Sequence, residues 1–185
     1  MMPLILASAS PRRRLILKEL KIPFRVVPSR LLEPPPGLLD PATYARKLAL
    51  AKARVVAKQA GTGLVLGADT VVVFKGEILG KPTDLGDAVR MLSKLQGATH
   101  KVITGVALVD AATGKERQAH AVSTVTMRPL DLKTIARLVP KNLDKAGAYA
   151  VQSKRDPVVA KIQGSYTNVV GLPTEILKKL LKVPA

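Results

Sequence analysis

The chain has 185 residues, 47% of them hydrophobic, and its 30 Lys and Arg residues outnumber 13 Asp and Glu residues to give a formal net charge of +17. This length fits a single domain over 1–185, or two small lobes that share one core around a central cleft. No apolar run approaches the roughly 20 residues of a membrane span, and the apolar part of the N-terminal segment is too short for a secretory signal, so we expect a cytoplasmic protein. The absence of cysteine excludes disulfides, thiolate nucleophiles and cysteine-based zinc sites, and leaves oxygen or histidine to hold any metal.

The positive charge predicts an electric field that attracts polyanions, both nucleotides and nucleic acids. Aromatic residues make up only 3% of the chain and tryptophan is absent, which is too little for an extended base-stacking platform. This composition counts against a module that binds single-stranded nucleic acid. The other interpretation of the charge is a solvated, lysine-rich surface.

The first elements along the chain are a strand over 3–7 and a helix over 11–21, joined by Ser8-Ala9-Ser10-Pro11, which is typical of a turn followed by an N-cap and a first-turn proline. The apolar residues of this helix lie three, four and seven positions after Arg13, so Arg13 shares their inward face. An inward arginine beside two serines and free backbone N–H groups is suited to phosphate oxygens. Pairing with a core carboxylate is the alternative.

A strand over 24–28 and a proline-rich loop over 29–40 come next, and the loop contains one acid, Glu33. Most loop acids are solvated, so only a partner elsewhere in the chain would give Glu33 a role. The next helix is expected from Asp40-Pro41 to residue 60, with Gly61 ending it. Lys52 falls within its apolar stripe, where the side chain either reaches solvent along the surface or directs its ammonium at a buried anion.

The segment 64–82 predicts a β-hairpin that turns at Lys75-Gly76. Asp69 lies in the middle of its first apolar strand, and burying an unpaired carboxylate costs several kcal/mol. Asp69 should therefore be paired, bound to a cation, or placed where the strand opens onto a ligand; an ion pair that only fixes the fold is the alternative. Lys81 ends the hairpin beside a glycine, where it could reach a phosphate, although the surrounding sequence is not a P-loop.

The remaining pattern predicts helices over 83–95 and 130–139, a long hairpin of strands 101–109 and 118–126, a strand over 158–162, a polar loop over 164–172 and a closing helix from Pro173. His100 and His120 lack metal-site spacing, so we expect each to have a structural, hydrogen-bonded role. Because hairpins alternate with helices, the order indicates an α/β or α+β fold on a mixed sheet.

Cations that face inward, combined with carboxylates for a hard metal, are typical of sites for phosphoryl transfer. Catalysis in such sites comes mainly from positioning the substrate and neutralising its charge. Water activated by a carboxylate or by bound Mg²⁺ would serve as the nucleophile.

Eight motifs in order across 4–173 resemble the Maf family of nucleoside triphosphate pyrophosphatases: SASPRR at 8–13, Glu33, KLALAKA at 47–53, GADTVV at 67–72, GKP at 80–82, THKVITGVAL at 99–108, DKAGAYAVQ at 144–152 and GSYTNVVGLP at 164–173. The resemblance implies a strongly twisted mixed sheet flanked by helices, similar to the inosine triphosphate pyrophosphatase fold. It also implies a divalent metal, Mg²⁺ or Mn²⁺, and a nucleoside triphosphate substrate. The branch acting on dTTP and UTP is the nearer match, and the resemblance leaves open whether the chain forms a homodimer.

Carried over position by position, the resemblance implies that Asp69 is the proton acceptor or a metal ligand and that Glu33 is the second acid near the metal. The phosphate-contacting positions match Ser8, Arg13, Lys52 and Lys81. The positions that set base choice match Arg12, Thr70 and Gln152.

The chain departs from the family pattern in three places: Leu32 replaces an acid, Ala150-Val151 replaces Gly-Ile in a step that could narrow the pocket, and Leu138 replaces an aromatic residue. A competing hypothesis is a nucleic-acid-binding or cell-division regulatory protein, suggested by the charge of +17 and by the family's name as septum formation inhibitors.

Overall fold

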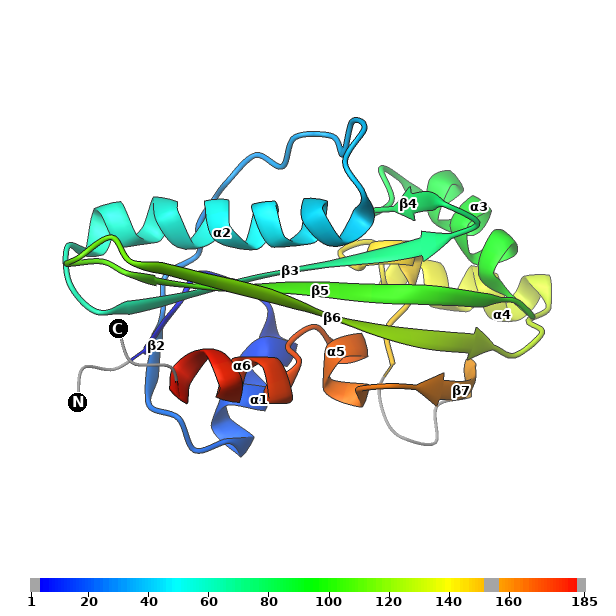
Figure 1. The fold of residues 1–185 in the computed structure, drawn as a ribbon. Coiled ribbons are helices and arrows are strands. Elements are labelled where there is room, and N and C mark those ends of the chain that lie inside the picture. The colour runs from blue at the N-terminus through cyan, green and yellow to red at the C-terminus, as the bar shows by residue number, and fades with distance from the viewer. Residues whose placement is uncertain (1–3, 152–156, 183–185) are drawn as a thin grey trace.

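The protein is built around one mixed β-sheet, which a computed structural model describes over residues 4–151 and 157–182 (Figure 1). The strands are β1 (Leu4–Leu6), β2 (Phe24–Val26), β3 (Leu64–Phe74), β4 (Glu77–Leu79), β5 (Thr99–Asp110), β6 (Glu116–Met127) and β7 (Val159–Gln163). They are arranged in the order β2-β1-β3-β5-β6-β7, with β4 also pairing with β3. β1 is parallel to both of its neighbours, and the other pairs are antiparallel. The mixed sheet expected from the sequence is confirmed.

Helices cover both faces of this sheet and one of its ends (Figure 1). They are α1 (Pro11–Glu19), α2 (Pro41–Ala60), α3 (Leu85–Leu95), α4 (Leu132–Leu138), α5 (Tyr166–Val170) and α6 (Thr174–Lys182), with short 3₁₀ turns at Val139–Lys141 and Ala146–Ala148. α2 lies along one face, while α1, α5 and α6 lie on the other. Within 4–151 and 157–182, none of the helices has the combination of length and apolar character that crossing a bilayer requires.

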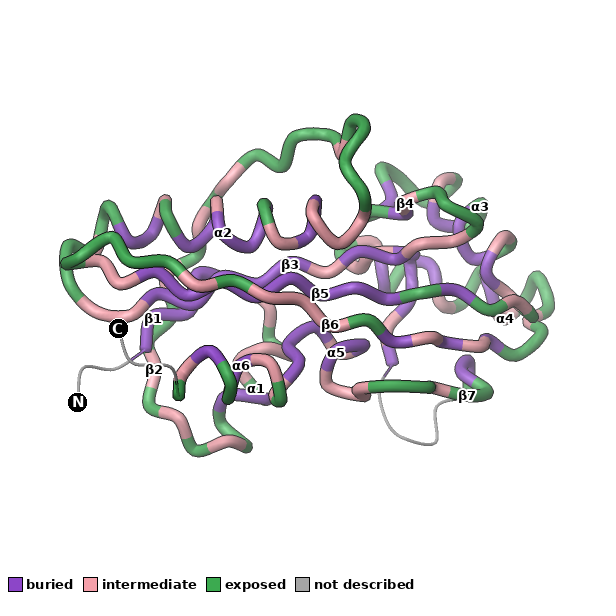
Figure 2. The backbone as a smooth tube through the Cα atoms, in the orientation of Figure 1, coloured by how far each residue is buried: buried purple, intermediate pink, exposed green. Residues whose placement is uncertain are grey.

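The alternation of side chains along the central strands explains the two layers. Val65 of β3 packs in a cluster with α2, whereas its neighbour Leu66 packs in a cluster with α1 and α6. Buried residues accordingly follow β3 and β5 through the middle of the molecule (Figure 2). Consecutive side chains of β3 therefore point to opposite faces of the sheet, and the same holds for Asp69 and Thr70.

The long helix α2 has the predicted bounds because both of its caps are encoded locally. The Asp40 carboxylate accepts hydrogen bonds from the N–H groups of Ala42 and Thr43 at 3.1 and 3.0 Å, and Gly61 ends the helix in the left-handed conformation with φ of 67°. The helix approaches the sheet so closely that a Cβ on Gly67 would stand 2.0 Å from the carbonyl oxygen of Ala49. Glycine is thus required where α2 crosses β3.

The prediction of a polar loop over 164–172 is wrong, because this segment contains α5. The Ser165 hydroxyl caps the helix by accepting from the N–H of Asn168, and Gly171 ends it with φ of 117°. A cluster of Ser, Thr and Asn residues is a usual loop signal. Here the hydroxyl and amide groups serve as a cap and as anchors to the sheet.

Candidate active site

A gap along one edge of β3 opens the middle of the sheet to a cleft. On that edge the pairing with β1 ends at Leu66, and the pairing with β4 begins at Val72. On this edge of β3, residues 67–71 therefore pair with neither β1 nor β4. Asp69 and Thr70 lie in the middle of this unpaired stretch. The cleft beside them has a volume of about 800 Å³.

The structure brings together all the sequence-predicted site residues that it describes. The residues that line the cleft include Ser8, Arg12, Arg13, Glu33, Lys52, Asp69, Thr70 and Lys81. They come from the β1–α1 turn, α1, the 29–40 loop, α2, β3 and the segment after β4. Ala150 and Val151 also line the cleft, whereas Gln152 lies outside the described residues.

Lys52 joins the two carboxylates of the site. Its Nζ atom lies 2.6 Å from Oδ1 of Asp69 and 2.7 Å from Oε1 of Glu33. Lys52 and Asp69 are 8% and 6% exposed, so the lysine directs its charge at a buried anion and does not extend to solvent. Glu33 has the partner that a solvated loop acid would lack. Since an ammonium group has three N–H bonds, one of them remains for a ligand.

The pKa values of the two acids shift in opposite directions, although the Lys52 ammonium acts to lower both. Burial raises the pKa of Asp69, although the charge and hydrogen bond of Lys52 oppose that rise. Burial also acts to raise the pKa of Glu33, but the hydrogen bond and charge of Lys52, followed by the charges of Lys81 and Arg13, bring it below its ordinary value. Burial thus outweighs the effect of Lys52 at Asp69 but not at Glu33.

Arg13 points inward from α1, as the helix periodicity predicts, and it is held by three neutral oxygens. Nε donates to the carbonyl oxygen of Gly171 at 2.8 Å, Nη1 to the Ser8 hydroxyl at 2.9 Å and Nη2 to the Thr70 hydroxyl at 3.2 Å. A guanidinium has five N–H bonds, so one hydrogen on each terminal nitrogen remains for a ligand. Within the described chain the expected alternative, an ion pair of Arg13 with a core carboxylate, is not formed.

Arg12 and Lys81 add to the positive lining of the cleft. Burial lowers the pKa of Arg12, and the charge of Asp144 partly offsets this effect. Lys81 is more exposed, with 59% of its side chain accessible, and its Nζ lies 3.8 Å from Oε1 of Glu33. Its long side chain can therefore follow a ligand that enters from solvent.

Both histidines are hydrogen-bonded, as expected. His100 Nε2 lies 2.6 Å from the Tyr149 hydroxyl, and His120 Nδ1 lies 3.2 Å from Nη1 of Arg46. Among the residues that the structure describes, no three His, Cys, Asp or Glu side chains form a cluster that could hold a metal by themselves. Any metal in the cleft would therefore use the Asp69 and Glu33 pair together with oxygens of a ligand.

Sequence reasoning missed three residues that support Arg13 and Thr70 through hydrogen bonds: Thr104, Asn168 and Gly171. Thr104 lies directly opposite Thr70 on β5, with 2.9 Å between the two hydroxyl oxygens. Thr104 and Asn168 are both fully buried. A usable signal was present in the Ser165 cap and Gly171, which mark the two ends of α5.

The fold and this site define a mixed α/β protein with a charged cleft in a gap of its sheet. Residues 3–183 match the model of the Maf-like protein family, and the chain belongs to that family.

Relatives and a solved structure resemble the chain over nearly its whole length. It is 47% identical to a dTTP/UTP pyrophosphatase of Pelotomaculum thermopropionicum, over 98% of this chain and 96% of that protein. It is 49% identical to a dTTP/UTP pyrophosphatase of Moorella thermoacetica, over 99% and 95%. The solved structure of the Staphylococcus aureus Ham1 protein superposes with a TM-score of 0.53 at 16% identity, covering 97% of this chain and 98% of that one. This last likeness concerns the fold alone, and it confirms the expected fold class.

Proposed function

We propose that the chain is a nucleoside triphosphate pyrophosphatase that acts on dTTP and UTP, with the cleft as its active site. The observation that carries the proposal is Asp69, a carboxylate that is 6% exposed, raised in pKa, and placed in the gap of the sheet beside cations. Perturbed carboxylates in a cleft are candidates for catalysis. The names of the relatives supply the substrate class.

In the proposed reaction a water oxygen attacks the α-phosphorus, and the bond from that phosphorus to the oxygen bridging to the β-phosphorus breaks. The products are the nucleoside monophosphate and pyrophosphate, which keeps the bridging oxygen. Asp69 accepts the proton that the water loses, because it is the buried carboxylate in the gap of the sheet. The remaining N–H groups of Arg13 and Lys52, together with Lys81, hold the phosphate oxygens.

The acid pair fits a divalent cation, Mg²⁺ or Mn²⁺. Asp69 and Glu33 each place one oxygen on the same Lys52 ammonium, so the two carboxylates lie close together. Magnesium is commonly held by one or two carboxylates plus substrate phosphates and water. When bound, the cation offsets the negative charge of the phosphates. Leu32, where the family often has another acid, is 91% exposed, so position 32 does not contribute to this pair.

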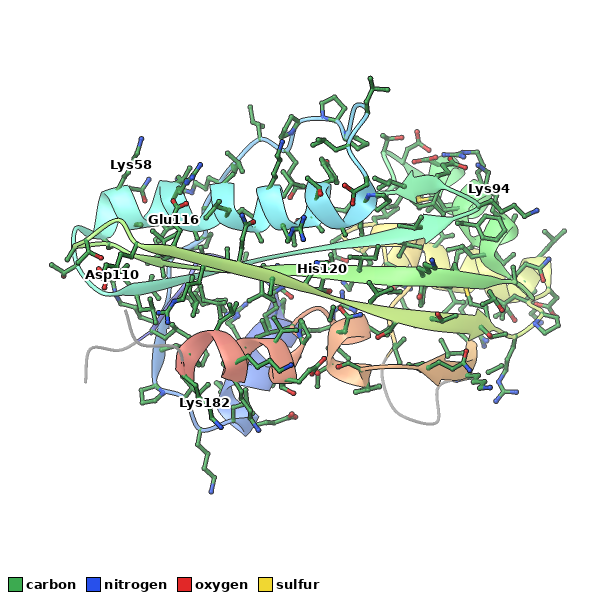
Figure 3. All side chains as sticks on the ribbon, viewed as in Figure 1. Lys58, Lys94, Asp110, Glu116, His120 and Lys182 are labelled. Carbon is green, nitrogen blue, oxygen red and sulfur yellow. The ribbon has the colours of Figure 1, made fainter. Side chains whose placement is uncertain are left out.

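Asp69→Asn tests the catalytic assignment. Pyrophosphate release from dTTP and UTP should fall by at least about a hundredfold, the contribution typical of a general base. Glu116→Gln is the matched control, because Glu116 also pairs with a cation of α2, Arg54, but does so on the outside of the C-terminal half of that helix (Figure 3). Near-normal turnover by Asp69→Asn would refute the assignment.

The substrate and metal assignments are tested by the wild-type protein. Pyrophosphate release is measured from all common and modified nucleoside triphosphates, with Mg²⁺, with Mn²⁺, and with a chelator. The proposal predicts release from dTTP and UTP that requires a divalent cation. Release from purine nucleotides only, or full activity in the chelator, would contradict it.

A further inference from the structure

The two hydroxyl groups that touch Arg13 differ in what they can offer a ligand. The Ser8 hydroxyl oxygen accepts hydrogen bonds from Nη1 of Arg13 at 2.9 Å and from the N–H of Ser10 at 3.3 Å. These two bonds use both lone pairs of the oxygen, so the proton of Ser8 is left to donate. Ser8 is therefore suited to a ligand atom that accepts, such as a phosphate oxygen.

The Thr70 hydroxyl offers the cleft an acceptor and not a donor, because Thr104 takes its proton. Thr104 Oγ1 lies 3.0 Å from the main-chain carbonyl oxygen of Asn168. This oxygen can only accept, so Thr104 donates its single proton to it. The contact of 2.9 Å between the hydroxyls of Thr70 and Thr104 then requires Thr70 to be the donor. Thr70 also accepts from Nη2 of Arg13. Its proton is used, and one lone pair is left for the cleft.

The acceptor at the end of this chain of hydrogen bonds is held rigidly. Asn168 is fully buried, and its side-chain Nδ2 donates to the carbonyl oxygen of Val102 at 3.0 Å and to the Ser123 hydroxyl at 2.9 Å. These bonds tie α5 to both β5 and β6, so the Asn168 carbonyl stays opposite Thr104.

We propose that Thr104 is a positioning residue that fixes Thr70 as a hydrogen-bond acceptor and thereby selects pyrimidines that carry a proton on ring nitrogen N3. Uracil and thymine carry a proton on N3, whereas cytosine has a lone pair there. Phosphate oxygens only accept hydrogen bonds, so Ser8 can donate to them, whereas Thr70 has no proton left to donate. This inference rests on the proposed function, because it takes a pyrimidine nucleotide as the ligand.

Thr104→Val tests the inference, because valine has nearly the shape of threonine but no hydroxyl. The Asn168 carbonyl oxygen keeps a hydrogen bond from the N–H of Gly171 at 3.0 Å, so it is not left without a partner. Thr70, released from Thr104, can turn its proton to the cleft and donate to N3 of cytosine. We expect the ratio of kcat/KM for UTP over CTP to fall about tenfold, the effect of one hydrogen bond.

Three variants separate this role from a structural one. Thr104→Ser restores the hydroxyl and should restore the wild-type ratio. Thr126→Val removes a hydroxyl from another cross-strand pair, Thr99 and Thr126, whose oxygens are also 2.9 Å apart, and should leave the ratio unchanged. Ser8→Ala should reduce activity toward UTP and CTP by the same factor.

Equilibrium binding of UMP and CMP is measured alongside turnover, because it does not depend on hydrolysis. A Thr104→Val protein that keeps the wild-type preference for UTP and UMP would overturn the inference. So would an equal loss for both bases. Failure of the proposed function is distinct, because the wild-type protein would then release no pyrophosphate from dTTP or UTP.

Discussion

Replacing Lys52 by methionine should destabilise the protein strongly and in a way that depends on pH. Methionine fills most of the volume of lysine but leaves Asp69, 6% exposed, without the ammonium that lies 2.6 Å away. Removing one partner of a buried ion pair costs about 3–5 kcal/mol, because the other charge stays buried and uncompensated. Glu33 adds little to this cost, since 34% of its side chain is exposed and water can solvate it.

The sign of the pH dependence follows from the pKa of Asp69. Burial raises this pKa, and the charge and hydrogen bond of Lys52 restrain it, so the pKa rises further when Lys52 is absent. A carboxyl group whose folded-state pKa is raised loses stability as the pH rises through that value. Lys52→Met should therefore be weakest at high pH and recover part of its deficit as the pH falls and the Asp69 carboxyl takes up a proton.

Urea and thermal unfolding at pH 8 and pH 5 measure both effects, and the expected loss at pH 8 corresponds to roughly 10 °C in Tm for a chain of this size. Arg54→Met is the matched control, because the Arg54–Glu116 pair of the same helix has 56% of the arginine side chain exposed and should contribute at most about 1 kcal/mol. The reasoning is refuted if Lys52→Met is no less stable than Arg54→Met, or if its deficit is the same at both pH values.

Two further predictions concern stability. Burial lowers the pKa of His100 from 6.5 to about 4. As the pH drops from 6.5 to 4, His100 therefore binds a proton in the unfolded chain but not in the folded one, and the free energy of unfolding falls by about 3 kcal/mol. His100→Gln should flatten this acid slope in urea unfolding, and an unchanged slope would contradict the prediction. Gly67→Ala should cost about 3 kcal/mol, at the upper end of the usual cost of overpacking, because the new Cβ would stand 2.0 Å from the Ala49 carbonyl oxygen. Gly80→Ala, with nothing within 4 Å of its Cβ, is the control, and equal stability of the two variants would rule the argument out.

The elements that the sequence predicts best are those whose signals are local. α2 begins after the Asp40 cap and ends at Gly61, as expected, because the cap, the proline and the glycine all lie within the segment that they delimit. The hairpin of β3 and β4 follows in the same way from Lys75-Gly76. α5 was missed, because its polar residues resemble a loop until the sheet against which they bond is known.

The candidate site shows the same division between local and distant information. The positions of Arg13 and Lys52 on inward helix faces, and the cost of a charge at Asp69, follow from periodicity and burial. Glu33 could be given a partner only after folding, since Lys52 is 19 residues away along the chain. The role of Gln152 stays a prediction.

By itself, the sequence determined the class of fold, the course of α2, and the identity of the charged groups, because these depend on neighbours a few residues apart. The tertiary structure alone decided that β1 ends and β4 begins on either side of Asp69, so that a mid-strand carboxylate opens onto a cleft. It also decided that Thr104 stands opposite Thr70 and sets the direction of its hydroxyl proton. Strand order, register and the direction of a hydrogen bond depend on pairings between distant segments, and a local pattern does not contain them.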